Sequence, residues 1–150
     1  MSFAADVAAT PHLADALRTG LGALEAADRT HITVGASVKL IGSVNVDLAL
    51  KQSQANAPRW DYVVGQKHDH TEFLNWVEVH PASGGGSIGE IQAKLSWLKA
   101  WMGSTLLAAY PKQVVWVASG RSAFNNRSPE IRKLANQGLV FTGNHLSLKP

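Results

Sequence analysis

A helical stripe between two strand patterns constrains the fold of this chain more than any other feature. The segment 73–80 alternates like a strand, and the apolar run 114–118 is typical of an interior strand. Between them, after the glycine-rich stretch 83–87, apolar residues recur at helical spacing, at Ile91, Leu95, Leu98 and Met102. A strand, a helix and a strand in this order indicate a sheet with a helix packed against it.

The first half of the chain is expected to contribute one helix and two strands. Four leucines at helical spacing predict a helix over residues 11–27: Leu13, Leu17, Leu21 and Leu24. Alternating apolar residues predict a strand over 38–50, with Gly42 as a bulge, and a shorter strand over 60–64. The polar segment 66–71 is expected to be a connection.

The second half is expected to add a helix and a strand after the central pair. Ser128-Pro129 starts a helix that Gly138 ends, and residues 139–142 form a last strand. Ser87 and Glu90 have the spacing of a capping box at the start of the central helix. The order α-β-β-β-α-β-α-β predicts an α/β protein of the α+β type, with one mixed sheet in a single domain over residues 1–150.

Composition excludes several classes of protein. With 45% apolar residues among 150, the chain can form a core, and disorder is not expected. It contains no run of about 18 apolar residues, so we expect no membrane-spanning helix. It begins without the basic and apolar blocks of a secretory signal, which favours a cytoplasmic protein. Having 0 cysteines, it cannot form disulfides or thiolate metal sites.

Two carboxylates are predicted to meet at one end of the sheet. Asp61 lies at the start of the 60–64 strand, and Glu78 lies near the end of the 73–80 strand. If these strands are antiparallel neighbours, the two side chains converge. Paired carboxylates suit Mg²⁺, which can lower the pKa of a bound water and stabilise a phosphoryl transition state. A strand-end charge in solvent is the plainer explanation for Asp61.

In this order of elements, the residues Asp61 and Glu78-Val79-His80 resemble the PD-(D/E)xK nuclease superfamily, which has the restriction-endonuclease-like fold. The family core is αβββαβ, with an aspartate opening the second strand and (D/E)xK on the third. His80 stands where the family has a lysine. The resemblance covers roughly residues 11–118 and leaves a C-terminal αβ addition.

The resemblance implies a metal-dependent nuclease in which Asp61 and Glu78 hold Mg²⁺ or Mn²⁺. The acid that many members carry on the first helix is matched by Glu25, or less well by Asp28. Some members carry the lysine on the following helix, where Lys94 is the candidate. At about 100° per residue, Lys94 lies about 70° from the centre of the apolar stripe, so it can face the sheet end or the solvent. His80 or Lys94 would then orient the attacking water.

Basic residues gather in the C-terminal half of the chain. Residues 76–150 hold 8 basic and 3 acidic side chains, whereas residues 1–75 hold 6 and 8. This asymmetry suits an anionic partner, which we expect to be nucleic acid, DNA in preference to RNA. A homodimer or a partner chain would supply specificity. The candidate phosphate contacts, which an ordinary exposed surface explains equally well, are Arg121, Arg127, Arg132 and Lys133.

His68 and His70 form a separate pair. Two histidines at this spacing suit a transition metal, and one of them can also serve a nuclease site as a proton acceptor. No further histidine or cysteine lies nearby at a recognisable metal-ligand spacing. A polar hairpin turn is therefore the favoured interpretation.

Two other function classes stay open. The replacement of lysine by His80 is compatible with a nuclease-fold protein that binds nucleic acid or a partner protein without cleaving anything. Alternatively, His68, His70 and Glu72 could form a small metal-binding domain, which predicts stoichiometric zinc and no affinity for DNA.

Overall fold

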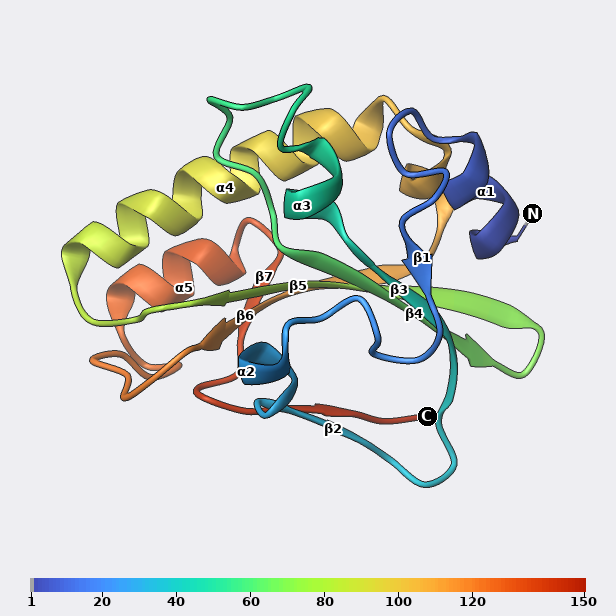
Figure 1. Ribbon diagram of the computed structural model, residues 1–150. Coiled ribbons are helices and arrows are strands. Elements are labelled where there is room, and N and C mark those ends of the chain that lie inside the picture. Colours follow the sequence, from blue (N-terminus) through green and yellow to red (C-terminus); the bar gives the residue numbers. More distant parts are fainter. Residues whose placement is uncertain (1) are drawn as a thin grey trace.

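The computed structural model describes residues 2–150, so Met1 lies outside the described residues. A central sheet carries helices on one face and a smaller two-stranded layer on the other (Figure 1). The six strands of the central sheet, in spatial order, are β1 (Leu17–Arg18), β3 (Lys39–Asn45), β4 (Tyr62–His68), β5 (Thr71–His80), β6 (Lys112–Ala118) and β7 (Leu139–Phe141). The second layer pairs β2 (Ile32–Val34) with β8 (Leu146–Leu148).

Residues 2–150 also form five α-helices and one 3₁₀ turn. They are α1 (Phe3–Ala9), α2 (Ala26–Arg29), α3 (Val46–Leu50), α4 (Gly85–Gly103), η1 (Leu106–Ala109) and α5 (Pro129–Ala135). In Figure 1, α1, α3, α4 and α5 lie above the sheet, and α2 lies below it with β2. Within residues 2–150, no helix is long and apolar enough to cross a membrane.

The sheet is mixed, which confirms the predicted α+β class. β4 pairs antiparallel with both β3 and β5, whereas β6 pairs parallel with both β5 and β7. α4 forms the crossover between the parallel strands β5 and β6. It buries the predicted stripe against the sheet: Ile91, Leu95, Leu98 and Met102.

Alternation along the strands divides the apolar side chains between two faces. Val63 and Trp76 belong to the cluster under α4, whereas Val64 and Val77 belong to the cluster on the opposite face. Side chains two residues apart on a strand share a face. Glu78 therefore lies on the α4 side of the sheet, two residues beyond Trp76.

The predicted helix over residues 11–27 is wrong, because its four leucines serve two different clusters. Leu13 and Leu17 pack in the cluster under α4, and Leu21 and Leu24 pack on the opposite face. The chain must therefore pass the edge of the sheet, where β1 pairs with β3. Positive φ angles at His12 (71°) and Gly20 (57°) are incompatible with a continuous helix.

The predicted strand over 38–50 is right only as far as Asn45. Gly42 forms the expected bulge: the register with β4 shifts there, and a Cβ would lie 2.9 Å from the carbonyl oxygen of Arg18. Asn45 then caps α3, since its side chain accepts a hydrogen bond from Leu48 N–H at 2.9 Å. The apolar alternation after residue 45 therefore belongs to a short helix.

Two local predictions around the hairpin and α4 also need correction. The segment 66–71 is mostly strand, because β4 and β5 extend to a tight turn at Asp69-His70, where Asp69 has a φ of 55°. The predicted capping box is wrong, because Gly84 is the N-cap of α4. Ser87 lies inside the helix, where its hydroxyl accepts a hydrogen bond from Ser83 N–H at 3.2 Å.

Gly65 fits β4 against α1. A Cβ at this position would lie 2.8 Å from Cδ2 of Phe3, whose ring is fully buried. We expect Gly65→Ala to lower the free energy of unfolding by about 2 kcal/mol, because the ring has no room to retreat. Chemical denaturation measures this change. Gly86→Ala in α4, where a Cβ meets nothing within 4 Å, is the matched control, and unchanged stability of Gly65→Ala would contradict the contact.

Candidate functional site

Asp61 and Glu78 lie side by side at one end of the β4–β5 pair. The antiparallel register pairs Tyr62 with Val77, which brings the residue before β4 opposite Glu78. Asp61 N–H donates to Glu78 Oε1 at 3.0 Å, and Val79 N–H donates to Asp61 Oδ2 at 3.0 Å. Each carboxylate is therefore held by the backbone of the other strand. The structure brings the two predicted carboxylates together and fixes one oxygen of each.

α4 adds a cation to this pair. Lys94 Nζ lies 2.8 Å from Glu78 Oε2 and also donates to the carbonyl oxygen of Arg59 at 3.1 Å. The Glu78 side chain is only 1% exposed, so Lys94 is its direct counter-ion in the protein interior. The sequence allowed Lys94 to face either the sheet end or the solvent, and in the structure it faces the sheet end.

His80 lies between Glu78, on the same face of β5, and Glu90 of α4. Its Nε2 lies 3.2 Å from Glu90 Oε2, and its Nδ1 lies 3.6 Å from Glu78 Oε2. From the sequence, Glu90 was assigned to a capping box and not to the site. Its spacing of one helical turn before Lys94 was the available signal, because residues four apart on a helix share a face.

Burial controls the charges in the site. Burial raises the pKa of Asp61 to about 6, although the Lys94 charge opposes this rise. Burial and the charge of Asp61 raise the pKa of Glu78 well above its ordinary value, again against Lys94. Burial and the Lys94 charge lower the pKa of His80. Near neutral pH, two adjacent acids thus share one ammonium group, and His80 is neutral.

The donor set suits a hard divalent cation. Each acid has one oxygen that takes no backbone N–H group within residues 2–150: Oδ1 of Asp61 and Oε2 of Glu78. Two neighbouring carboxylates with a single ammonium lack positive charge, which a divalent cation supplies. Mg²⁺ is commonly held through one or two carboxylates, with water completing its shell. In the described part of the chain, no group of three or more acidic, histidine or cysteine side chains is arranged to hold a metal ion.

Glu25 and Asp28, the two acids considered for the first helix, both lie at α2, below the sheet, and the α4 side of the sheet holds Glu78. Glu25 is exposed at the N-cap of α2, and its contact is through its backbone N–H, which donates to the Tyr62 hydroxyl at 3.3 Å. The Asp28 carboxylate accepts from the same hydroxyl at 2.5 Å. Its charge also contributes to the raised pKa of Asp61. The structure thus does not bring Glu25 to Asp61 and Glu78. Nothing in the sequence indicated the role of Tyr62, whose hydroxyl contacts both the Glu25 backbone and the Asp28 carboxylate.

The predicted basic residues lie on exposed surface beyond β6. Arg132 and Lys133 are on α5, and Arg121 and Arg127 are in the loop before it. This loop is fixed beside the end of β5, where Ser119 N–H donates to the His80 carbonyl at 3.2 Å. Arg121 and Arg127 therefore lie in a loop at the same end of the strands as the carboxylates.

His68 and His70 lie at the far end of the β4–β5 hairpin, and both are exposed. At about 3.3 Å per strand residue, His68 is roughly 20 Å from Asp61. Their predicted role in proton transfer at the carboxylates is therefore wrong. The favoured interpretation of the segment as a polar turn is confirmed at Asp69-His70.

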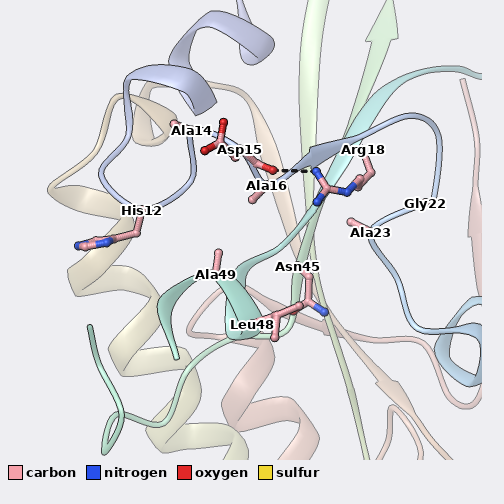
Figure 2. A pocket seen from close by; sticks show the side chains of 10 residues that line it. All are labelled: His12, Ala14, Asp15, Ala16, Arg18, Gly22, Ala23, Asn45, Leu48 and Ala49. Atoms are coloured by element: carbon pink, nitrogen blue, oxygen red, sulfur yellow. Dashed lines mark hydrogen bonds between the residues drawn. The ribbon is translucent and has the colours of Figure 1, made fainter. Parts of the chain in front are cut away.

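A hollow of about 470 Å³ lies between α3 and the segment that leads into and out of β1. Figure 2 shows its wall of residues 12–23 facing Asn45, Leu48 and Ala49. The Arg18 guanidinium is held there by the carbonyl oxygen of Asp15 at 2.8 Å. The first turn of α3 joins this hollow to the site, because Val46 N–H donates to the Asp61 carbonyl at 2.9 Å.

The raised pKa of Asp61 predicts a protein that is more stable without this carboxylate. Between 3.8 and about 6, the folded protein keeps a proton that the unfolded chain has released, so stability falls as the pH rises through this window. We expect Asp61→Asn to raise the free energy of unfolding by about 2 kcal/mol at about pH 8, and by much less at about pH 4.

Denaturant unfolding in chelator at both pH values measures this gain. Asp15→Asn, at an exposed position in the hollow beside α3, is the matched control and should show no comparable difference between the two pH values. A lower stability of Asp61→Asn at alkaline pH would contradict the proposed cost of the buried charge.

Comparisons of this chain with protein-family models, with curated proteins and with solved structures found no match. The arrangement of the side chains described above is therefore the basis for assigning a function.

Proposed function

We propose that this protein is a metal-dependent nuclease of the PD-(D/E)xK superfamily that hydrolyses phosphodiester bonds, in DNA in preference to RNA. The observation that carries the proposal is the group of Asp61, Glu78 and Lys94 at one end of an antiparallel strand pair. The order β3-β4-β5-β6 with α4 as the crossover agrees with the expected core. Before β3, residues 2–150 contain only short helices, α1 and the one-turn α2, where the family has its first helix.

The residues of the site divide the chemistry between them. Asp61 and Glu78 would hold Mg²⁺ or Mn²⁺, which supplies Lewis acidity and lowers the pKa of a bound water. Lys94 orients the attacking water and offsets the charge that develops on the phosphate. His80 is neutral and is held by Glu90. It would accept the proton that the attacking water loses.

The position of Lys94 favours an active enzyme over a protein that only binds nucleic acid. His80 replaces the motif lysine, but the ammonium group of Lys94 stands 2.8 Å from the motif glutamate. A cation is therefore available at the carboxylates without a lysine on β5.

The surroundings of the site support a nucleic-acid substrate. Arg121 and Arg127 are exposed in a loop at the same end of the strands as the carboxylates. They are therefore available to phosphates on either side of the scissile bond. The proposal includes a homodimer or a partner chain as the source of specificity, and a cytoplasmic location.

The test is cleavage of supercoiled plasmid and of single-stranded DNA by purified protein, with Mg²⁺, with Mn²⁺ and with chelator. The matched control is Asp61→Asn, because we expect this variant to be at least as stable as the wild type. Cleavage that requires metal and disappears in Asp61→Asn supports the nuclease. Equal cleavage in chelator, or by the variant, would contradict it.

Two further outcomes separate the alternatives. Binding of DNA without cleavage in either metal favours the non-catalytic nuclease-fold protein. Such binding should weaken steeply with salt if phosphate contacts dominate. Stoichiometric zinc without affinity for DNA favours the metal-binding domain built on His68 and His70.

A further inference from the structure

A cavity of about 500 Å³ lies on the sheet face that is turned away from the catalytic carboxylates. Gln66, Asn75 and Gln113 line it from the neighbouring strands β4, β5 and β6. The C-terminal segment, red in Figure 1, runs below the sheet and contributes Lys149 to the wall. Cavities of this size are typical of sites for small molecules.

Three carboxamides form a continuous chain of hydrogen bonds across these strands. Gln113 Nε2 donates to Asn75 Oδ1 at 2.7 Å, and Asn75 Nδ2 donates to Gln66 Oε1 at 2.9 Å. Gln66 Nε2 then donates to the carbonyl oxygen of Lys149 at 2.8 Å. We call these three side chains the amide chain.

The amide chain occupies a part of the sheet that could have been apolar. Asn75 is 0% exposed and Gln66 is 5% exposed, on a face where neighbouring positions hold Val64, Val77 and Val115. Buried amides must find hydrogen-bond partners, whereas valines need none. What the chain adds is a fixed orientation of the Gln113 amide, because its nitrogen is tied to a buried acceptor.

Gln113 ends the amide chain and has hydrogen-bonding groups to spare. Its Oε1 accepts no hydrogen bond from residues 2–150, and its Nε2 donates only the bond to Asn75. One free acceptor and one free N–H on this amide match an acceptor and a donor that neighbour each other on a nucleobase edge. Asparagine and glutamine pair with N6 and N7 of adenine in this way.

The remaining walls suit a flat ring with a phosphate attached. Phe73 and Pro111 line the cavity, and nucleobases stack on aromatic side chains. Lys149 is exposed at the rim, where its ammonium group is available to a phosphate.

We propose that this cavity binds a nucleobase, adenine before the others, with Gln113 pairing its edge and Phe73 stacking on its face. A free nucleotide and an unpaired position in a strand offer the same chemistry. The inference does not depend on the nuclease proposal. At about 3.3 Å per strand residue, Gln66 lies roughly 16 Å along the chain from Asp61, and it faces the opposite side of the sheet.

The experiment is isothermal titration calorimetry in chelator, where no metal-dependent cleavage occurs. Wild-type protein is titrated with AMP, GMP, CMP and TMP, and with a short single-stranded oligonucleotide of adenine. The same titrations are made with Gln113→Leu and Phe73→Leu. Gln92→Leu, at an exposed position on α4, is the matched control. Thermal melts show that each variant is folded.

We expect saturable binding of AMP that is tighter than binding of CMP. Gln113→Leu should weaken AMP binding by at least about tenfold and remove the preference for adenine. Phe73→Leu should weaken binding of all four nucleotides by about fivefold or more, and Gln92→Leu should change nothing. Tighter binding of AMP than of the oligonucleotide identifies a free nucleotide as the ligand, and the reverse identifies a base in a strand.

Two results would overturn the inference. One is the absence of saturable binding of AMP and of the oligonucleotide at concentrations up to about 5 mM. The other is binding that Gln113→Leu and Phe73→Leu both leave unchanged, which would place the ligand elsewhere on the molecule. Either result leaves the nuclease proposal intact, because the cleavage assay depends on Asp61 and metal.

Discussion

Glu78→Gln is expected to lower the rate of metal-dependent DNA cleavage by at least about 10³-fold. Glutamine keeps the volume of the buried side chain, and its oxygen can still accept the hydrogen bond from Asp61 N–H. Its NH₂ group, however, would face Lys94 Nζ, where the carboxylate now accepts a hydrogen bond at 2.8 Å. The site loses both a negative ligand and the partner of its ammonium group.

Initial rates over a series of Mg²⁺ concentrations measure this loss and show whether saturating metal restores activity, which we do not expect. Glu130→Gln, at an exposed position on α5, removes the same charge away from the site and should leave the rate unchanged. A Glu78→Gln rate within tenfold of the wild-type rate would remove Glu78 from the mechanism.

Lys94→Met is expected to reduce cleavage by about 10²- to 10³-fold and to lower the free energy of unfolding by about 2 kcal/mol at about pH 8. Methionine keeps the apolar stem but leaves Glu78 and the Arg59 carbonyl without their donor. The folded protein must then keep Glu78 protonated at a pH where the unfolded chain releases the proton. Stability should therefore fall further as the pH rises, and the loss should be smaller at about pH 5.

Two variants make this result specific. Lys99→Met alters another lysine of α4, which is exposed and donates to the Gln137 carbonyl, so it should change neither activity nor the pH dependence of stability. Lys94→Arg keeps the positive charge and should retain more stability than Lys94→Met. Full cleavage by Lys94→Met would leave the catalytic cation unassigned.

The centre of the fold could be predicted because its patterns are local and strong. The apolar stripe of α4 has a helical period, and the continuous apolar run in β6 is typical of an interior strand, so the strand–helix–strand unit follows from chain order. The position of Asp61 opposite Glu78 follows from the same order, once β4 and β5 are antiparallel. The angle of Lys94 on α4 was compatible with its position at the carboxylates but equally compatible with a position in solvent.

The N-terminal third could not be predicted, because its periodicity has two causes. The leucines between residues 13 and 24 are spaced like a helix but are divided between two faces of the sheet, which only the tertiary structure reveals. The surroundings of Glu25 and Asp28 could not be predicted for the same reason. It depends on where α2 lies against Tyr62, and Tyr62 is on a different element.

The reciprocal hydrogen bonds of Asp61 and Glu78 have a consequence for the speed of metal exchange. These two backbone hydrogen bonds lie at the open end of the β4–β5 hairpin and hold Glu78 Oε1 and Asp61 Oδ2 in place. The separation of the two carboxylates is therefore established when the chain folds. A cation held by these acids as proposed would have to shed water and replace the Lys94 ammonium group at Glu78 Oε2, with little reorganisation of the backbone. If the proposed metal site exists, we therefore expect its loading and unloading to depend on the hydration shell of the ion and on the Lys94 side chain rather than on backbone motions.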